Sequence, residues 1–240
     1  MDVSPKSGMS RARLDRGLYT WAALIAVLVV FAGFARSYYL KGVFGAPALS
    51  PLLHIHGLVM SAWFILFVVQ VWLVEARQVA AHRRLGYAGA ALAVVVVAVG
   101  ALAGITAASL GRSPPGVPPL SFLAVPLGDM TVFAILIGLG VAYRKRGDVH
   151  KRWMLLASLS MLTAAYARIP LEFIGRGGLP MFFALTDATV IVCILVDTWK
   201  HRRLHPVFGW GLALMVGSQV FRFWFSGTET WMQFAGWLTS

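Results

Sequence analysis

The chain is poor in cysteine and in charge. Its 240 residues include a single cysteine, Cys193, which excludes an intramolecular disulfide and any CxxC metal or redox motif. Only 12% of the residues are charged, whereas 59% are apolar, a balance typical of membrane proteins. The sequence also lacks H-E-x-x-H, Walker A and G-x-S-x-G motifs, which excludes the common metalloprotease, nucleotide-binding and serine-hydrolase signatures.

Apolar residues are gathered in long runs that are nearly free of charge. About 20 such residues let a helix cross roughly 30 Å of hydrocarbon. We therefore expect an all-α, polytopic membrane protein with seven transmembrane helices. The predicted spans are 18–39, 51–74, 85–108, 121–143, 153–174, 181–199 and 206–226. The last span contains no lysine, which excludes a retinal Schiff base of the microbial-rhodopsin kind.

Lysine and arginine are distributed unevenly between the two sets of connections. With the N-terminus inside, 15 of the 21 lie on the inner face, so the positive-inside rule predicts a cytoplasmic N-terminus and a periplasmic C-terminus in a bacterial inner membrane. The same distribution explains the net charge of +12 without nucleic acid. The expected partners are the lipid bilayer and, at the inner face, its anionic lipid head groups.

Short motifs recur on the predicted inner face. HRRL stands at 82–85 and at 201–204, and HKR stands at 150–152, each just before a span. The pattern indicates three helical hairpins after one extra helix, which is either an internal repeat or a chance product of the positive-inside rule. The predicted domains are a basic segment 1–17, a membrane domain 18–226 and an aromatic-rich interfacial segment 227–240.

Ionisable residues of five spans fall at one depth near the outer surface. A charge within a span costs about 2.5 to 3.5 kcal/mol on the insertion scale, so it normally faces the bundle interior and meets a partner. We therefore expect a shared polar site in the outer leaflet. Its predicted members are His54, His56, Asp129, Arg168, Glu172, Asp187 and Arg222. It is either an ion-pair network, with Arg168 joined to Glu172 at i, i+4, or a binding or catalytic site.

The two histidines of the second span cannot chelate one ion together. Ser50 and Pro51 predict a helix that is regular from its start, and two helical steps rotate by about 200°. At most one histidine faces the site, and His56 lies deeper than His54. His56 shares a helical face with Met60 and Trp63.

The cofactor stays open between a transition metal and haem. A metal site would combine His56 with Asp129 and Asp187, and water would complete the shell. A haem would take a methionine of another helix as its second axial ligand. The candidates are Met130, Met181 and Met215. Gly100 and Gly104 form a GxxxG step that is typical of helix packing.

A second group of histidines and basic residues lies on the inner face. Its members are His82, Arg83, His150, Arg152 and His205. The three histidines each begin a helix, and two of them are placed to approach one another. Interfacial histidines beside basic residues commonly meet lipid phosphates and cap loops, and the alternative is a functional site.

The motifs LHIHG, HRRLGYAGA, VHKRWMLLASLSML, ARIP and HPVFGWG resemble those of a group of uncharacterised bacterial multipass inner-membrane proteins over residues 50–226. More distantly, the hairpins look like small multipass families that include haem-copper oxidase assembly factors. The resemblance implies respiratory or haem-related work and assigns no ligand. It maps onto His54, His56, His82, Arg83, His150, Arg152, Arg168 and His205.

Three functions are therefore expected as alternatives. The first is an integral-membrane redox or cofactor-handling protein, for haem or a metal, with the outer polar site open to the periplasm. The second is a transporter or sensor of a small anionic or zwitterionic solute, held by Arg168 and Arg222. The third is a non-catalytic subunit or assembly scaffold, for which the aromatic segment FRFWFSGTETWMQFAGWL offers a surface to other membrane proteins. Whether the protein is an enzyme stays open.

Overall fold

The fold is entirely helical in the part of the chain that the structure describes. This computed structural model describes residues 6–240, and side chains from residue 17 onward, so residues 1–5 of the predicted basic segment 1–17 lie outside the described residues. Helices make up 81% of the structure, and residues 6–240 contain no strand. The predicted all-α class is confirmed.

The elements follow one another with short connections. They are α1 (Lys6–Phe34), the π-helical turn η1 (Ala35–Tyr39), α2 (Pro51–Glu75), α3 (Val79–Ser109), α4 (Pro119–Phe122), α5 (Ala124–Ala142), α6 (Gly147–Ser160), α7 (Thr163–Tyr166), α8 (Glu172–His201), α9 (Pro206–Phe225) and α10 (Glu229–Thr239). Two predicted helix starts are confirmed by their caps. The Ser50 hydroxyl accepts from the Leu53 N–H at 3.4 Å, and His205 Nδ1 accepts from the Val207 N–H at 3.2 Å.

Several helices are long and apolar enough to cross a membrane. Within the described residues these are the five segments Gly17–Tyr39, Pro51–Glu75, Val79–Ser109, Pro119–Ala142 and Glu172–His201. Large apolar side chains on their outer faces are exposed, among them Leu58, Ile65 and Val94. Such side chains suit a lipid environment, so the chain has the build of a membrane protein.

The predicted span 153–174 is not one continuous helix. Helix α6 ends at Ser160, the short α7 follows, and the chain then leaves helical geometry until α8 begins at Glu172. Pro170 explains the second interruption, because proline lacks an N–H and restricts the residue before it. Helix α8 is itself interrupted at Gly178, whose φ of 58° is left-handed. Its regular part therefore starts close to the predicted residue 181.

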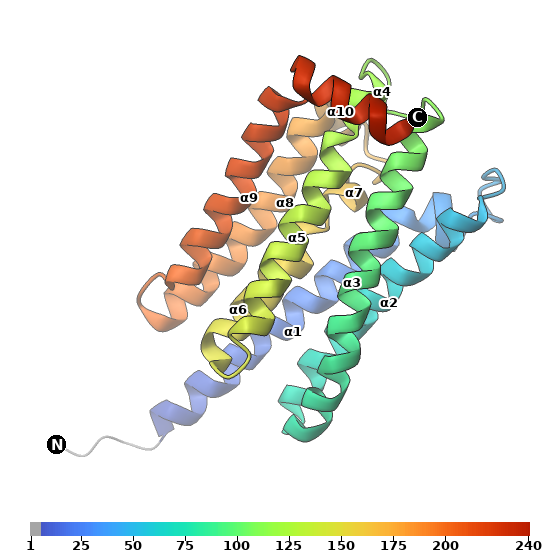
Figure 1. The fold of residues 1–240 in the computed structure, drawn as a ribbon. Coiled ribbons are helices and arrows are strands. Elements are labelled where there is room, and N and C mark those ends of the chain that lie inside the picture. The colour runs from blue at the N-terminus through green and yellow to red at the C-terminus, as the bar shows by residue number, and fades with distance from the viewer. Residues whose placement is uncertain (1–5) are drawn as a thin grey trace.

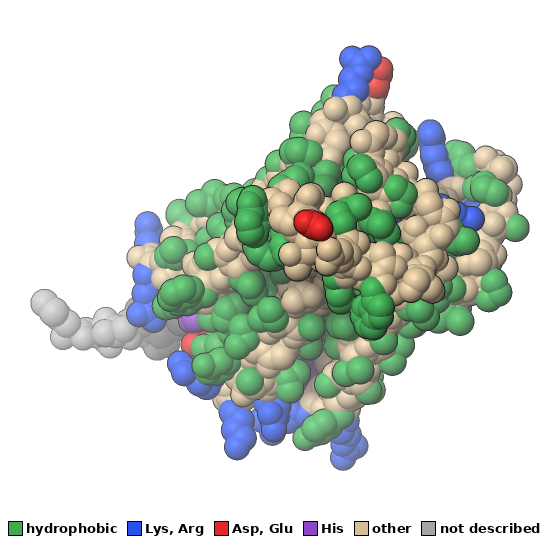
Figure 2. All heavy atoms as spheres, turned by 45° about the horizontal axis from the view of Figure 1, so that its top comes forward, with side chains coloured by type: hydrophobic (Ala, Val, Ile, Leu, Met, Phe, Trp, Pro, Cys, Tyr) green, Lys and Arg blue, Asp and Glu red, His purple; other side chains and the backbone are tan. Residues whose placement is uncertain are grey.

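The helices form one bundle (Figure 1). The connections α2–α3, α5–α6 and α8–α9 lie at the lower end, and α10 lies across the upper end, packed against α4 and α3. Several lysine and arginine side chains lie along the lower edge of the space-filling view, others project at its top, left and right edges, and the surface that faces the viewer shows hydrophobic side chains among other groups (Figure 2). The connections at the lower end of Figure 1 carry basic residues, among them Arg77, Arg144 and Arg202.

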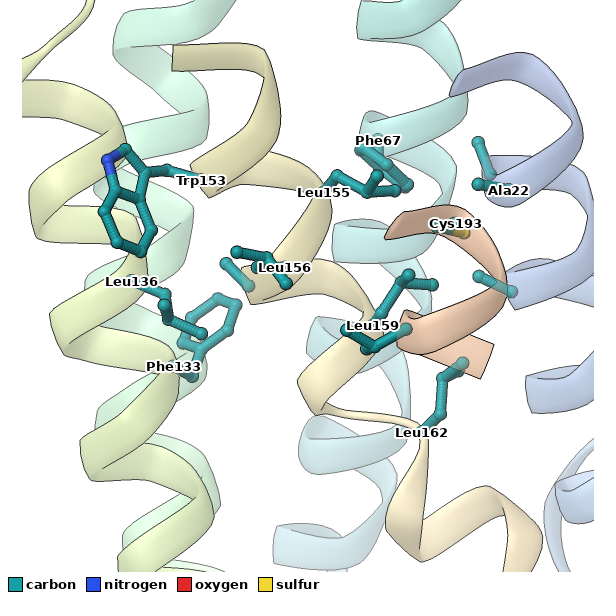
Figure 3. Packing of buried hydrophobic residues seen from close by; sticks show 14 of the residues in the cluster. Ala22, Phe67, Phe133, Leu136, Trp153, Leu155, Leu156, Leu159, Leu162 and Cys193 are labelled. Carbon is teal, nitrogen blue, oxygen red and sulfur yellow. The ribbon is translucent and has the colours of Figure 1, made fainter. Parts of the chain in front are cut away.

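Helix α6 lies at the centre of the packing. Its Leu155, Leu156 and Leu159 are fully buried and pack among side chains of α2, α5 and α8 (Figure 3). Phe133 of α5 adds an edge-on contact with Trp63 of α2, with ring centroids 4.9 Å apart. Because lipid tails are as apolar as leucine, such a core is held by close van der Waals contact rather than by removal from water. This packing on several sides holds α6 in place and thereby positions the polar side chains near its two ends.

Candidate functional site

An arginine and an aspartate of different helices are joined at the upper end of the bundle. Arg222 of α9 donates to Asp129 Oδ1 of α5 at 2.6 Å and to the Val125 carbonyl at 3.1 Å. The side chains are only 8% and 16% exposed. Phe183 lies 5.0 Å from the guanidinium carbon, in cation–π contact. Of the seven residues predicted for the outer polar site, Asp129 and Arg222 are therefore in direct contact.

Asp187 joins the same network through a residue that the sequence did not single out. Its Oδ1 accepts from the Gln219 side-chain amide at 3.0 Å. Gln219 lies three residues before Arg222 on α9, so both side chains leave the same helix face. That spacing is the signal that could have identified it. The network thus links α5, α8 and α9.

The space beside this network is small. A cavity of about 10 Å³ remains between α5, α9 and the end of α6, lined by Asp129, Val132, Ser160, Thr163, Met215, Gln219 and Arg222. That volume holds about one water molecule. Each carboxylate already has a protein partner, so the arrangement orients helices and offers no room for a solute or haem.

The other predicted members of the outer site lie apart from it. His54 is exposed beside Tyr38, with ring centroids 6.1 Å apart, whereas His56 is half-buried, as predicted from its depth. Arg168 follows α7 and donates to the Ala164 carbonyl at 2.8 Å, with its guanidinium over Phe34. These contacts keep Arg168 away from the Asp129 network.

Glu172, another residue predicted for the outer polar site, lies outside it. It forms an exposed ion pair with Arg176 in the first turn of α8, so the predicted pairing of Glu172 with Arg168 is wrong. The break before α8 is the reason, because it separates the two residues that a continuous helix would place on one face. Among the described residues no three His, Cys, Asp or Glu side chains are grouped to hold a metal. The predicted set of His56, Asp129 and Asp187 is therefore not assembled.

The larger cavity lies at the opposite, basic end. Its volume is about 210 Å³, it opens to the surface, and it is lined by Asp148, Lys151, Arg152, His201, Arg203 and His205. Helix α6 supplies the first three, and the end of α8 with its connection to α9 supplies the others. Arg152 and His205 belong to the predicted inner group. Lys151 and Arg203, which also line the cavity, were counted in the sequence only among the basic residues that set the topology.

A buried ion pair closes the inner side of this cavity. Arg152 donates from Nη2 to both carboxylate oxygens of Asp197 at 2.9 Å, and from Nη1 to the Asp148 carbonyl at 2.8 Å. His201 Nδ1 lies 2.8 Å from the Asp197 carbonyl. The sequence analysis did not include Asp197. Its signal is an acidic residue inside a span four positions before a histidine, at the same face of α8.

His205 connects the two helices that begin at the cavity. Its Nδ1 caps α9, and its Nε2 lies 3.6 Å from Asp148 Oδ2 at the start of α6. Burial, followed by the positive charge of Arg152, lowers the pKa of His205 below 6.5. Partial burial opposes ionisation of Asp148, yet the Val149 N–H and His205 outweigh it and hold the pKa of Asp148 below 3.8. The neutral imidazole and the carboxylate therefore coexist at neutral pH.

The charges around the cavity favour an anion. Lys151, Arg152 and Arg203 contribute three positive charges, and the carboxylates of Asp148 and Asp197 offset two of them. Helices α6 and α9 both begin here, and a helix N-terminus carries about half a positive charge. Backbone N–H groups at such ends bind phosphate and carboxylate readily. The site is thus positive, polar and open.

The other inner histidines form a separate pair. The rings of His82 and His150 lie 6.2 Å apart and nearly perpendicular, which confirms that two inner histidines approach one another. His150 Nδ1 is 2.7 Å from the Gly140 carbonyl, and the Gln70 amide is placed to donate to His82 Nδ1 at 2.9 Å. Arg83 is exposed on α3. The pair does not line the basic cavity.

No protein-family model, curated protein or solved structure matches this chain. The resemblance of its motifs to uncharacterised inner-membrane proteins, and to oxidase assembly families, therefore stays a prediction. Function has to be inferred from the geometry and chemistry of the chain itself.

Proposed function

We propose that this protein is a seven-pass protein of the bacterial inner membrane that binds a phosphate-type anion in its basic cavity, at the cytoplasmic end. The five long apolar segments supply five passes, and α6–α7 and α9 supply the other two. The basic connections then lie in the cytoplasm with the N-terminus, and α10 lies at the periplasmic interface, in line with the positive-inside rule.

One observation carries the proposal, namely the 210 Å³ cavity with its five basic or histidine side chains. Arg152 is fixed by Asp197 and forms a rigid edge, while Lys151 and Arg203 supply the remaining positive charge. A tetrahedral phosphate group fits this volume and takes hydrogen bonds from several donors at once. The second predicted function, recognition of a small anionic solute, is therefore the one that the geometry supports best.

The site differs from the predicted one in its place and its members. The expected anion ligands were Arg168 and Arg222, but Arg222 is occupied by Asp129 and Arg168 packs on Phe34. The redox or cofactor hypothesis loses its predicted metal site, because His56, Asp129 and Asp187 are not grouped in the described structure. The role of an assembly scaffold stays a prediction, since no described feature favours it over ligand recognition.

Two sources can present the same phosphate chemistry at this place. One is the head group of an anionic phospholipid, because the cavity lies where the inner lipid head groups would lie. The other is a small phosphorylated solute of the cytoplasm. Both carry the charge and the oxygen geometry that Lys151 and Arg203 recognise, so the experiment has to separate them.

The test compares these sources on the purified full-length protein in uncharged detergent. Its thermal stability is measured against inorganic phosphate and glycerol phosphate, and its lipid binding against nanodiscs of phosphatidylcholine with or without phosphatidic acid. Saturating ligand at 100 times Kd should stabilise the fold by about 2.7 kcal/mol. Stabilisation by the solutes favours solute recognition, and stabilisation by phosphatidic acid alone favours a lipid.

Matched variants make the test specific. Arg203→Gln removes a cavity charge, whereas Arg112→Gln removes an exposed charge at the other end of the bundle. We expect Arg203→Gln to weaken binding about tenfold and Arg112→Gln to leave it unchanged. Equal loss in both variants, or no binding of any phosphate compound, contradicts the proposal.

A further inference from the structure

Two methionines of different helices meet the same backbone position on α3. Gly100 has no side chain, and a Cβ there would overlap the Met130 sulfur of α5 and lie 3.2 Å from the Met60 methyl of α2. The missing Cβ therefore leaves a hollow in which both thioether side chains lie. Met130 is 7% exposed, so this hollow is inside the bundle.

The histidine His56 lies one helical turn before Met60 on α2. His56 precedes Met60 by four residues on α2, so the two side chains share a helix face. Its ring lies near the backbone of Val99, the residue before Gly100. His56 Nδ1 is buried and has no hydrogen-bond partner among the residues that the structure describes. An unpaired buried polar atom costs about 1 to 3 kcal/mol, so a native fold that retains one calls for an explanation.

A bound ion provides that explanation, and the ligand types indicate which ion. One imidazole and two thioethers form a neutral, soft donor set, which selects Cu(I) among biological metals. Zinc prefers thiolate, imidazole and carboxylate, and Asp129, the residue before Met130, is occupied by Arg222. The positive charge of Arg168 also acts on the His56 ring, which disfavours a divalent ion more than a monovalent one.

We infer that His56, Met60 and Met130 bind one Cu(I) ion in the hollow at Gly100. The unbranched methionine side chains can rotate to bring their sulfurs to the ion at little cost. This site lies on α2, α3 and α5, whereas the basic cavity is formed by α6, α8 and the connection to α9. The copper inference therefore does not rest on the proposed anion binding, and each can fail without the other.

The experiment is an anaerobic Cu(I) titration of the purified full-length protein against a chromophoric Cu(I) chelator. We expect one Cu(I) per chain, and Cu K-edge X-ray absorption should show both sulfur and nitrogen neighbours. Zn²⁺ should not compete. The absorption measurement uses the unaltered protein, so it tests the ligand set even where a variant fails to fold.

Variants then assign the ligands. Met60→Leu and Met130→Leu keep the volume of the side chain, and His56→Asn removes the imidazole. Each should weaken Cu(I) binding by about tenfold or more, in the range that loss of a metal-supporting group produces. His54→Asn, two residues away, and Met215→Leu, a buried methionine of α9, are the matched controls and should bind as the unaltered protein does.

Two results would overturn the inference. One is unaltered protein that takes up no Cu(I) in the presence of the chelator. The other is bound copper without sulfur neighbours, or binding that persists undiminished in Met130→Leu and His56→Asn. Melting temperatures measured without copper show whether each variant is folded, and only folded variants are compared.

Discussion

Arg152 and Asp197 form a bidentate ion pair between α6 and α8, with side chains that are 3% and 0% exposed. The flat guanidinium matches both carboxylate oxygens, which fixes the relative rotation of the two helices. The same guanidinium faces Phe208 of α9, with 5.7 Å between its carbon and the ring centroid. The pair therefore sets the inner side of the basic cavity, on which the proposed anion site depends.

Breaking this pair should be costly. Asp197→Asn leaves the Arg152 charge without its buried partner, and losses of about 3 to 5 kcal/mol are typical for such a change. The free energy of unfolding can be followed by denaturant titration in mild detergent. Asp148→Asn is the control, because Asp148 is 61% exposed, and it should change stability by less than about 1 kcal/mol. Equal effects of the two substitutions would speak against a structural role for the buried pair.

The stability of the ligand-free protein should fall as the medium is acidified through the His205 titration. The folded pKa of His205 lies below its usual 6.5, so between these two values the unfolded chain binds more protons than the folded one. Stability then rises with pH across that window and falls as the pH drops below 6.5 toward the folded pKa. His205→Asn keeps a side chain that can cap α9 and should reduce this slope. A melting temperature with the same pH dependence in both proteins would refute the assignment to His205.

Two glycines of α5 provide a matched test of the outer network. A Cβ at Gly128 would overlap the Arg222 side chain, whereas a Cβ at Gly138 would meet no described atom of another element within 4 Å. Gly128→Ala should displace Arg222 from Asp129 and destabilise the fold by about 1 to 3 kcal/mol. Gly138→Ala should be neutral or slightly stabilising, since alanine is the better helix former. Equal melting temperatures of the two variants would show that the missing side chain at Gly128 is not needed for the contact between Arg222 and Asp129.

The orientation of the chain can be tested with fusions. Alkaline phosphatase joined after Ser240 should be active, because the C-terminus is proposed to be periplasmic. The same reporter placed after Lys145, between α5 and α6, should be inactive, and green fluorescent protein at that position should fluoresce. The opposite pattern at both positions would invert the topology and would place the basic cavity outside the cell.

Local signals made the helix boundaries predictable. Ser50 before Pro51, and His205 before Pro206, mark helix starts through capping and the fixed φ of proline, and α2 and α9 begin there. The fifth span could not be predicted in the same way, because its apolar pattern continues through a break. The interruption after Ser160 changes the backbone without changing the hydropathy. The second interruption, at Pro170, separates Glu172 from Arg168 and places Glu172 at the start of α8.

The candidate site was predictable in part. Asp129, Asp187 and Arg222 were expected to share one polar site, since a charge within a span has to find a partner, but the sequence did not show which residues would pair. Which residues converge depends on helix rotation and tilt, which hydropathy does not encode, so His56 was wrongly grouped with the carboxylates. The basic cavity was missed for another reason. Lys151 and Arg203 follow the positive-inside rule, and only the assembled ends of α6, α8 and α9 show that they surround one space.

The most direct test of the proposed function is calorimetric titration of the purified full-length protein with glycerol phosphate and with short-chain phosphatidic acid at low salt. We expect saturable binding of one phosphate group per chain to at least one of these ligands. In the double variant Lys151→Gln, Arg203→Gln that binding should be lost, while Arg112→Gln should retain it. Undiminished binding in the double variant, or no saturable binding of either ligand to the unaltered protein, would contradict the proposed function.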